Sequence, residues 1–227
     1  MSIRLIVFDV AGTTVLDDDA VIDAMQTACA TRRVPVDRRS IKAVMGMPKL
    51  QAIQKLLAGA PAVAPQTIDP LAAQVHAAFI EFLLRRYRRD STVRPVPEAV
   101  NVFKQLREAG IRIALDTGFS REVLDVLLTR LEWTHGVVDV TVTSDEVEKG
   151  RPHPHLIRRA MQLTGIKEAH EVAKVGDTPA DIEEGRAAGC GLVVGVTYGT
   201  HSRAELERFA VPLIDRLPDL LLLVGAA

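Results

Sequence analysis

The chain has 227 residues, a formal net charge of −1 at pH 7, 48% hydrophobic residues and 25% charged residues. A chain of this size and composition can bury one large core, or a core with a smaller insert, without disulfides or structural metals. We expect a cytoplasmic globular protein that binds neither nucleic acid nor a membrane, because its charges balance, no secretory signal is evident and no apolar run approaches the roughly 18 residues of a membrane span.

The first predicted element is a buried strand, Leu5–Asp9, and a block of helices follows it. The helical patterns of this block cover Ala20–Arg33, Arg38–Met45, Leu50–Leu57 and Thr67–Tyr87. They predict a small all-helical domain, residues 17–91, inserted into a core formed by residues 1–16 and 92–227. With hinges near Val15–Asp18 and Ser91–Pro97, this domain could close over the strand ends and exclude water.

Strands and helices alternate after this block. The apolar runs typical of buried parallel strands are Ile111–Asp116, Val138–Val142, Val172–Val175 and Leu192–Val196. Helical patterns cover Pro97–Ala109, Arg121–Leu131, His155–Leu163 and Ala180–Ala188. The alternation predicts an α/β fold with a doubly wound parallel sheet, in which ligands bind beyond the carboxyl ends of the strands.

The end of the first strand carries the first candidate site. Asp9 can cap a helix, or its carboxylate can attack phosphorus and form an acyl phosphate. Gly12 and Thr13 would let backbone N–H groups face phosphoryl oxygens. Enzymes that transfer phosphoryl groups to an aspartate usually carry a second acid two residues later, but this chain has Ala11 there, which cannot donate a proton. The site is therefore either inactive, or it expels a leaving group that needs no proton from this position.

Three further segments are expected near Asp9. Thr117 and Gly118 end the second strand, where the threonine hydroxyl could bond a phosphoryl oxygen. Arg151, which precedes a proline and a helix, could neutralise an anion with its two-pronged guanidinium. Asp177 and Asp181 follow the fourth strand of the core, and carboxylates at this spacing suit a hard divalent cation. We interpret Asp181 as a support that orients Asp177 or Arg151, although it could also bind the metal through water.

The order of these segments resembles the haloacid dehalogenase superfamily of phosphotransferases over nearly the whole chain. The resemblance implies that superfamily's Rossmann-like core with a small helical cap after the first strand. It also implies that Asp9 is the nucleophile and that Thr117 and Arg151 hold the phosphoryl group. Mg²⁺ would be bound by Asp9, Asp177 and the backbone carbonyl of Ala11.

At three positions the sequence resembles the phosphonatase branch of this superfamily, the phosphonoacetaldehyde hydrolases. They are Ala11 in place of the second acid, Arg151 in place of the superfamily's usual lysine, and Lys49 within the segment Met-Gly-Met-Pro-Lys. The resemblance implies that Lys49 forms a Schiff base with a substrate carbonyl. Met45 at the start of this segment would line the substrate pocket or pack in the core.

This branch offers a reason for the missing acid. Direct cleavage of a C–P bond would expel a carbanion, whereas an iminium on the neighbouring carbon accepts the electrons and becomes an enamine. A lysine that acts as the electron sink leaves no departing oxygen to protonate, and its amine must be neutral, so we expect a lowered pKa for Lys49. This chain departs from the branch at two positions. It has Ala52 where the branch has a histidine, and Phe119 where the branch has a tyrosine.

The sequence thus predicts a Mg²⁺-dependent hydrolase that cleaves the C–P bond of a 2-oxo-alkylphosphonate. One alternative is a phosphatase with low activity on small phosphate esters, whose rate should follow the acidity of the leaving group. The other is a non-catalytic protein that binds phosphorylated metabolites. In each case the partner is a small phosphonate or phosphate, and the resemblance suggests a homodimer formed through the cap.

Overall fold

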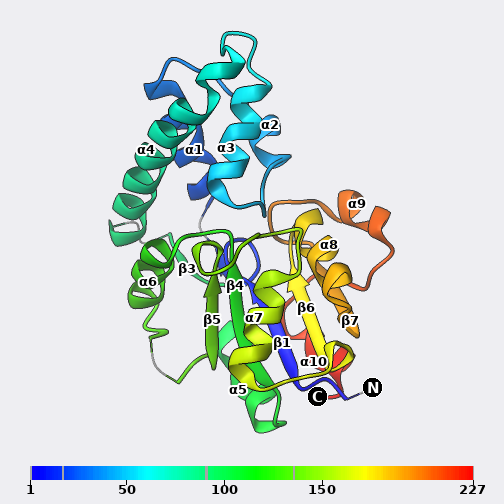
Figure 1. Ribbon diagram of the computed structural model, residues 1–227. Coiled ribbons are helices and arrows are strands. Elements are labelled where there is room, and N and C mark those ends of the chain that lie inside the picture. Colours follow the sequence, from blue (N-terminus) through cyan, green and yellow to red (C-terminus); the bar gives the residue numbers. More distant parts are fainter. Residues whose placement is uncertain (1, 17, 90–91, 135, 227) are drawn as a thin grey trace.

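The core of the protein is a six-stranded parallel sheet with the strand order β5-β4-β1-β6-β7-β8 in a computed structural model (Figure 1). The structure describes residues 2–16, 18–89, 92–134 and 136–226. The strands are β1 (Leu5–Asp9), β4 (Arg112–Thr117), β5 (Val140–Thr143), β6 (Val172–Gly176), β7 (Leu192–Val196) and β8 (Leu213–Ile214). This confirms the predicted doubly wound α/β fold. The strand β8 was not predicted, because two residues are too few to form a recognisable apolar run.

Helices cover both faces of the sheet. The core helices are α5 (Ala99–Glu108), α6 (Arg121–Arg130), α7 (His155–Thr164), α8 (Pro179–Ala188), α9 (Arg203–Leu206) and α10 (Asp219–Val224). Single 3₁₀ turns lie at Pro65–Thr67, Ser144–Glu146, Ala169–Glu171 and Glu207–Phe209. Along β1, Leu5 and Val7 pack with residues of α7, while Ile6 and Phe8 belong to the larger hydrophobic cluster on the other face, where Phe8 meets Phe103 of α5 with ring centroids 5.2 Å apart. A strand buried on both faces explains the unbroken apolar run from which it was predicted.

A separate group of helices forms a cap above the carboxyl ends of the strands (Figure 1). Its helices are α1 (Ala20–Thr31), α2 (Arg38–Lys42), α3 (Lys49–Ala58) and α4 (Ile68–Arg89). The predicted all-helical cap after the first strand is therefore confirmed. The helix α2 ends three residues earlier than predicted, because the chain turns at Gly46, whose φ of +82° lies in the left-handed region.

The two segments that cross between core and cap pair with each other. Strand β2 (Val15–Leu16) and strand β3 (Arg94–Pro95) form an antiparallel ribbon, with Val15 opposite Pro95. The predicted domain boundaries beside residues 17 and 91, and parts of both predicted hinges, lie outside the described residues. The division into 1–16 plus 92–227 and 17–91 therefore stays a prediction.

The loop that precedes α3 brings the cap into contact with two loops of the core. A Cβ atom on Gly118 would lie 2.8 Å from the carbonyl oxygen of Met47, and a Cβ atom on Gly150 would lie 2.4 Å from Pro48. These glycines follow β4 and precede α7, so the absence of a side chain at each lets the cap come down on the strand ends. Within the described ranges, no helix has the length and apolar character needed to cross a membrane.

Candidate active site

The structure brings the predicted site residues of the core together at the carboxyl edge of the sheet. Asp9 ends β1, Thr117 ends the neighbouring strand β4, and Asp177 follows β6 on the other side of β1. Arg151 reaches the same place from the loop before α7. All four are buried, with exposures of 5% for Asp9, 3% for Thr117, 1% for Arg151 and none for Asp177.

The guanidinium of Arg151 is the centre of this arrangement. Its Nη1 donates to Asp9 Oδ1 at 2.6 Å, and its Nη2 donates to Asp116 Oδ1 at 2.5 Å. Nε donates to Glu184 Oε2 at 3.1 Å, and Asp181 Oδ1 lies 3.0 Å from Nη1, the nitrogen that also contacts Asp9. Each nitrogen of the guanidinium is therefore oriented by a carboxylate, and Arg151 links the end of β1 to the end of β4 and to α8.

Three members of this network, Asp116, Lys174 and Glu184, were not predicted from the sequence. Lys174, in the middle of β6, is fully buried and forms ion pairs with Asp116, with Asp181 at 3.2 Å and with Glu184 at 3.2 Å. Glu184, on α8, is also fully buried and contacts both Lys174 and Arg151. A signal was present, because Lys174 interrupts an otherwise apolar strand run, and a charge there must find a buried partner.

Negative charge exceeds positive charge in this network. Five carboxyl groups (Asp9, Asp116, Asp177, Asp181 and Glu184) face two buried cations (Arg151 and Lys174). Burial raises the pKa of Asp9 to about 7, although Arg151 opposes the shift, and burial with the nearby Asp181 raises the pKa of Asp177 to about 6. Burial and Asp116 raise the pKa of Glu184 well above its usual range. The pKa of Asp116 is lowered, because Arg151 and Lys174 outweigh its burial.

The excess of carboxylates fits a divalent cation. The positions of the two buried cations favour a metal site on the Asp177 side of the network. Asp9, Asp116 and Asp181 offer oxygen atoms within 4.8 Å of one another. Asp116 and Asp181, however, already contact Arg151 and Lys174, and these cations would repel a metal ion. On the other side, Asp177 accepts hydrogen bonds from the neutral donors Thr13 Oγ1 at 3.2 Å and Thr200 N–H at 2.7 Å. Asp177 thus has no cationic partner among the described residues, whereas Asp9 pairs with Arg151 through Oδ1. These two side chains are the ones predicted from the sequence to bind the metal.

The turn after β1 is built around Asp177. Gly12 has a φ of +92°, and a Cβ atom on it would lie 2.3 Å from Asp177 Oδ2. The N–H groups predicted to face phosphoryl oxygens are used within the turn: that of Gly12 donates to Val15 O at 2.8 Å and that of Thr13 to Val10 O at 3.3 Å. In this structure Thr13 therefore acts on the site through its hydroxyl, which holds Asp177.

A hollow of about 340 Å³ opens beside this turn, between core and cap. Ala11 and Gly12 form part of its wall, and Met45 lines it from the cap. Both of Met45's predicted environments are thus present, because its side chain is 8% exposed and also belongs to the hydrophobic core. The half-buried Ala11 faces space into which a longer side chain could extend.

Lys49, the predicted cap residue of the site, is turned toward the core. It is the first residue of α3 and is only 7% exposed. Its Nζ lies 5.4 Å from the ring centroid of Phe119, the residue after Thr117 and Gly118. The amine therefore lies at the loop that ends β4 and not in bulk solvent. Ala52, one turn further along α3, is fully buried and offers no proton-transfer group.

Comparisons with known proteins give a consistent picture. A sequence model of the haloacid dehalogenase-like hydrolase family matches residues 3–189. A protein named phosphonoacetaldehyde hydrolase from Bacteroides fragilis is 31% identical over 224 residues, which cover 94% of this chain and 84% of the relative. A solved phosphonoacetaldehyde hydrolase-like protein from Oleispira antarctica superposes with a TM-score of 0.84 at 20% identity, covering 99% of this chain and 92% of the other. A solved candidate phosphoglycolate phosphatase from Lactobacillus delbrueckii superposes with a TM-score of 0.82 at 17% identity, covering 99% of both chains.

Proposed function

Because the chain belongs to the haloacid dehalogenase-like hydrolase family, we propose that it is a phosphonatase-like enzyme that cleaves the C–P bond of a 2-oxo-alkylphosphonate such as phosphonoacetaldehyde. The observation that carries this proposal is the inward placement of Lys49. A lysine 7% exposed at the start of α3 faces the loop after β4, while Ala11 beside Asp9 offers no acid. The relatives named phosphonoacetaldehyde hydrolase support the same choice of substrate.

Lys49 prepares the leaving group in this proposal. Its neutral amine adds to the carbonyl carbon of the substrate, and uptake of one proton from solvent with loss of water gives an iminium. Asp9 then attacks phosphorus, so that an O–P bond forms as the C–P bond breaks. The electron pair of the C–P bond moves into the iminium and gives an enamine on Lys49. Hydrolysis of the aspartyl phosphate releases phosphate and restores Asp9, and protonation and hydrolysis of the enamine release the carbonyl product and restore Lys49.

Arg151 and Thr117 hold the phosphoryl group. Arg151 Nη1 contacts Asp9 at 2.6 Å, so an incoming phosphonate oxygen would share this prong with the nucleophile. Asp116 and Glu184 hold the other nitrogens of the guanidinium. The guanidinium therefore stays in place while Nη1 takes up the phosphonate oxygen. Thr117 lies next to Asp116 at the end of β4, where Gly118 leaves room for the cap loop.

Asp9, Asp177 and the backbone carbonyl of Ala11 would hold Mg²⁺. The support for this ligand set is the buried carboxylate of Asp177, which has no cationic partner among the described residues and lies near Asp9. Bound there, the cation would screen the repulsion between the Asp9 carboxylate and the phosphonate dianion. A homodimer formed through the cap and a cytoplasmic location remain predictions from the sequence.

Borohydride trapping tests the proposal. The protein is incubated with phosphonoacetaldehyde and Mg²⁺, reduced with borohydride, digested and mapped by mass spectrometry, while released phosphate is measured in parallel. We expect a reduced adduct on Lys49 together with phosphate release. The variant Lys49→Met should give neither, whereas Lys55→Met, which changes an exposed lysine of the same helix, should behave as the wild type.

Two other outcomes would replace the proposal. Phosphate release from esters with acidic leaving groups, without an adduct on Lys49, would identify a phosphatase that uses the Asp9 and Arg151 side of the site alone. Binding of phosphorylated compounds without turnover of any substrate would identify a non-catalytic binding protein.

A further inference from the structure

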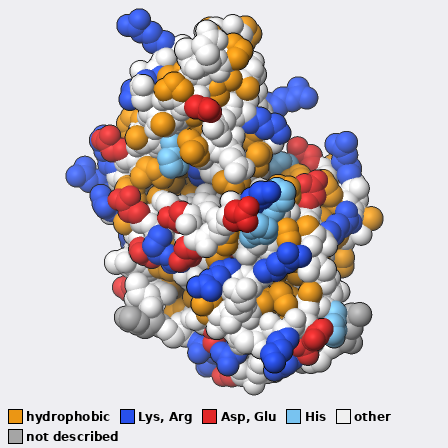
Figure 2. All heavy atoms as spheres, viewed as in Figure 1, with side chains coloured by type: hydrophobic (Ala, Val, Ile, Leu, Met, Phe, Trp, Pro, Cys, Tyr) orange, Lys and Arg blue, Asp and Glu red, His pale blue; other side chains and the backbone are white. Residues whose placement is uncertain are grey.

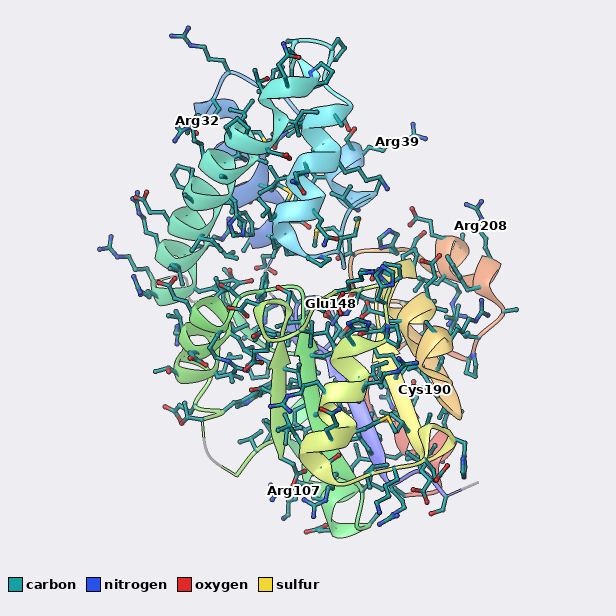
Figure 3. All side chains as sticks on the ribbon, viewed as in Figure 1. Arg32, Arg39, Arg107, Glu148, Cys190 and Arg208 are labelled. Carbon is teal, nitrogen blue, oxygen red and sulfur yellow. The ribbon has the colours of Figure 1, made fainter. Side chains whose placement is uncertain are left out.

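A second cleft between cap and core lies outside the network around Asp9. Its volume is about 720 Å³. The cap contributes Arg38, Arg39 and Lys42 from α2, and the core contributes His201 and Arg208 from the segment that follows β7. Figure 3 shows Arg39 and Arg208 on the same side of the molecule, one on each side of the junction between cap and core. The cleft thus has a basic residue on both of its walls.

Much of this positive charge has no protein partner. Arg38 is held by Asp19 at 2.5 Å and by Asp23 at 2.6 Å. Over the part of the chain that the structure describes, no ion pair joins Arg39, Lys42 or Arg208 to an acidic side chain. Figure 2 shows Lys and Arg side chains on both sides of the junction on this face. A concave surface with three such cations attracts anions.

Among the described residues that line the cleft, Glu205 is the one acid, and it is already engaged. Glu205 Oε2 accepts hydrogen bonds from Ser202 N–H at 2.8 Å and from Ser202 Oγ at 2.7 Å, and so caps α9. The Ser202 hydrogen bonds lower the pKa of Glu205, and the charge of Lys42, across the cleft on α2, adds to the effect. A single carboxylate does not cancel the charge of three cations.

His201, a buried imidazole in the same lining, has one ring nitrogen without a partner in the part of the chain that the structure describes. His201 is 8% exposed, and its Nδ1 has no hydrogen-bond partner among the described residues. A buried polar nitrogen without a hydrogen-bond partner is unfavourable. An imidazole nitrogen can donate a hydrogen bond to an oxyanion when it carries the proton. The cleft lining therefore contains one ring nitrogen without a hydrogen-bond partner as well as cations without an ion pair among the described residues.

We propose that this cleft binds a small, multiply charged oxyanion that contacts cap and core together. Phosphate-bearing and carboxylate-bearing small molecules share the required chemistry, which is several oxygens with at least two negative charges. Because Lys42 and Arg39 belong to the cap while His201 and Arg208 belong to the core, such a ligand binds better when the cap is closed. It would then shift the cap toward the closed arrangement by its difference in affinity for the two states. The proposal does not depend on the reaction catalysed at Asp9.

The test titrates the whole protein with inorganic pyrophosphate in the absence of Mg²⁺. The NMR signals of the His201 ring, assigned with His201→Gln, report on the cleft, and calorimetry gives the affinity. We compare wild type with the double variant Lys42→Gln/Arg208→Gln, and use Arg32→Gln/Arg130→Gln as the matched control with one exposed arginine changed in the cap and one in the core. A parallel titration with citrate separates phosphate from carboxylate ligands.

We expect pyrophosphate to shift the His201 signals and to bind roughly tenfold or more weakly to the double variant, since each removed charge at close range is worth about a fivefold change. The control variant should bind like the wild type. Pyrophosphate should also slow hydrogen exchange of the Val96 amide, which donates to Thr14 O at 2.9 Å beside the β2–β3 ribbon, in wild type but not in the double variant. Unchanged His201 signals, equal affinity of wild type and double variant, or binding that leaves Val96 exchange unaltered would each overturn the proposal.

Discussion

The core side of the candidate active site, its floor, and the cap side, its roof, are built in opposite ways. On the floor, Arg151 and Lys174 are locked among carboxylates from β1, β4 and α8, with contacts of 2.5–3.2 Å. On the roof, a single cap lysine, Lys49, lies over the aromatic ring of Phe119, and Met45 lines the neighbouring hollow. The floor is a rigid charged scaffold, and the roof presents one amine against an apolar surface.

This difference suggests a division of tasks. A dense network of buried ion pairs holds its members in fixed positions, because moving one leaves the others unpaired at high cost. Such a floor suits the binding of a phosphoryl group at a fixed nucleophile. A lysine on a cap can approach and leave with the substrate, which suits a group that must bond covalently to the substrate and later release it.

The largest expected effect is that of the nucleophile. Asp9→Asn keeps the shape of the side chain but removes the attacking carboxylate, so phosphate release from phosphonate and from ester substrates should fall by roughly 10⁴-fold or more. Both rates are measured by phosphate release under the same conditions. Asp125→Asn, a change on the exposed face of α6, serves as the control. An Asp9→Asn variant that still cleaved either substrate at the wild-type rate would place the nucleophile elsewhere.

Removal of Lys174 should destabilise the floor. In Lys174→Met the carboxylates of Asp116 and Glu184 lose a buried cation, which is expected to lower the free energy of unfolding by about 3–5 kcal/mol. For a chain of this size that corresponds to a fall in Tm of about 10 °C. Calorimetry of the single variant and of Lys174→Met/Glu184→Leu measures it. The double variant should recover much of the loss, and equal Tm values for both variants would show that the pair is not coupled.

An acid at position 11 should allow the enzyme to hydrolyse a different class of substrate, phosphate esters whose leaving group needs a proton. Ala11→Asp places a carboxyl group at the hollow beside Asp9, where it can protonate a departing oxygen. Hydrolysis of alkyl phosphates should rise by roughly 100-fold, whereas p-nitrophenyl phosphate, whose leaving group needs no proton, should gain little. Initial rates over a series of esters give the dependence on leaving-group acidity. Ala11→Asn, which cannot donate in this way, should show no gain; if it matches Ala11→Asp, proton donation is not the cause.

Mg²⁺ should stabilise the protein more at pH 7.5 than at pH 5. The pKa values of about 7 for Asp9 and about 6 for Asp177 lie above the ordinary value of 3.8, so the metal-free folded state binds more protons than the unfolded state and loses stability as pH rises through this window. The cation replaces those protons. At 100 times its Kd it should add about 2.7 kcal/mol, or a rise in Tm of about 5–10 °C.

Thermal unfolding with and without Mg²⁺ at the two pH values measures this effect. Asp177→Asn should abolish most of the gain at pH 7.5. A gain that survives in Asp177→Asn would argue for the alternative group of Asp9, Asp116 and Asp181. A gain that is independent of pH would show that the cation does not replace protons on Asp9 or Asp177.

Much of the floor could be predicted from the sequence, because its parts follow local patterns. The strands Leu5–Asp9 and Leu192–Val196 have the predicted bounds, and a buried parallel strand shows itself as an apolar run. The carboxyl ends of such strands meet at one edge, so Asp9, Thr117 and Asp177 could be placed together before their contacts were known.

Other features depend on contacts between distant parts of the chain. Lys174 finds Asp116 at a separation of 58 residues, and no local pattern selects that partner. The pairing of Val15 with Pro95 across the whole cap is of the same kind. The early end of α2 follows from the turn at Gly46, whose Cβ position is filled by Thr178 of the core. The inward placement of Lys49 likewise required the three-dimensional structure, because one residue at a helix start has no periodicity to orient it.

The division between floor and roof is tested most directly by Lys49→Arg, which keeps a long cationic side chain but cannot form an imine. The measurement is the ratio of phosphate release from phosphonoacetaldehyde to that from p-nitrophenyl phosphate, in Lys49→Arg and in the control Lys55→Arg. We predict that C–P cleavage falls to the uncatalysed background in Lys49→Arg, that ester hydrolysis by the floor persists, and that the control keeps the wild-type ratio. Undiminished C–P cleavage in Lys49→Arg, or an equal loss of both activities, would contradict this account.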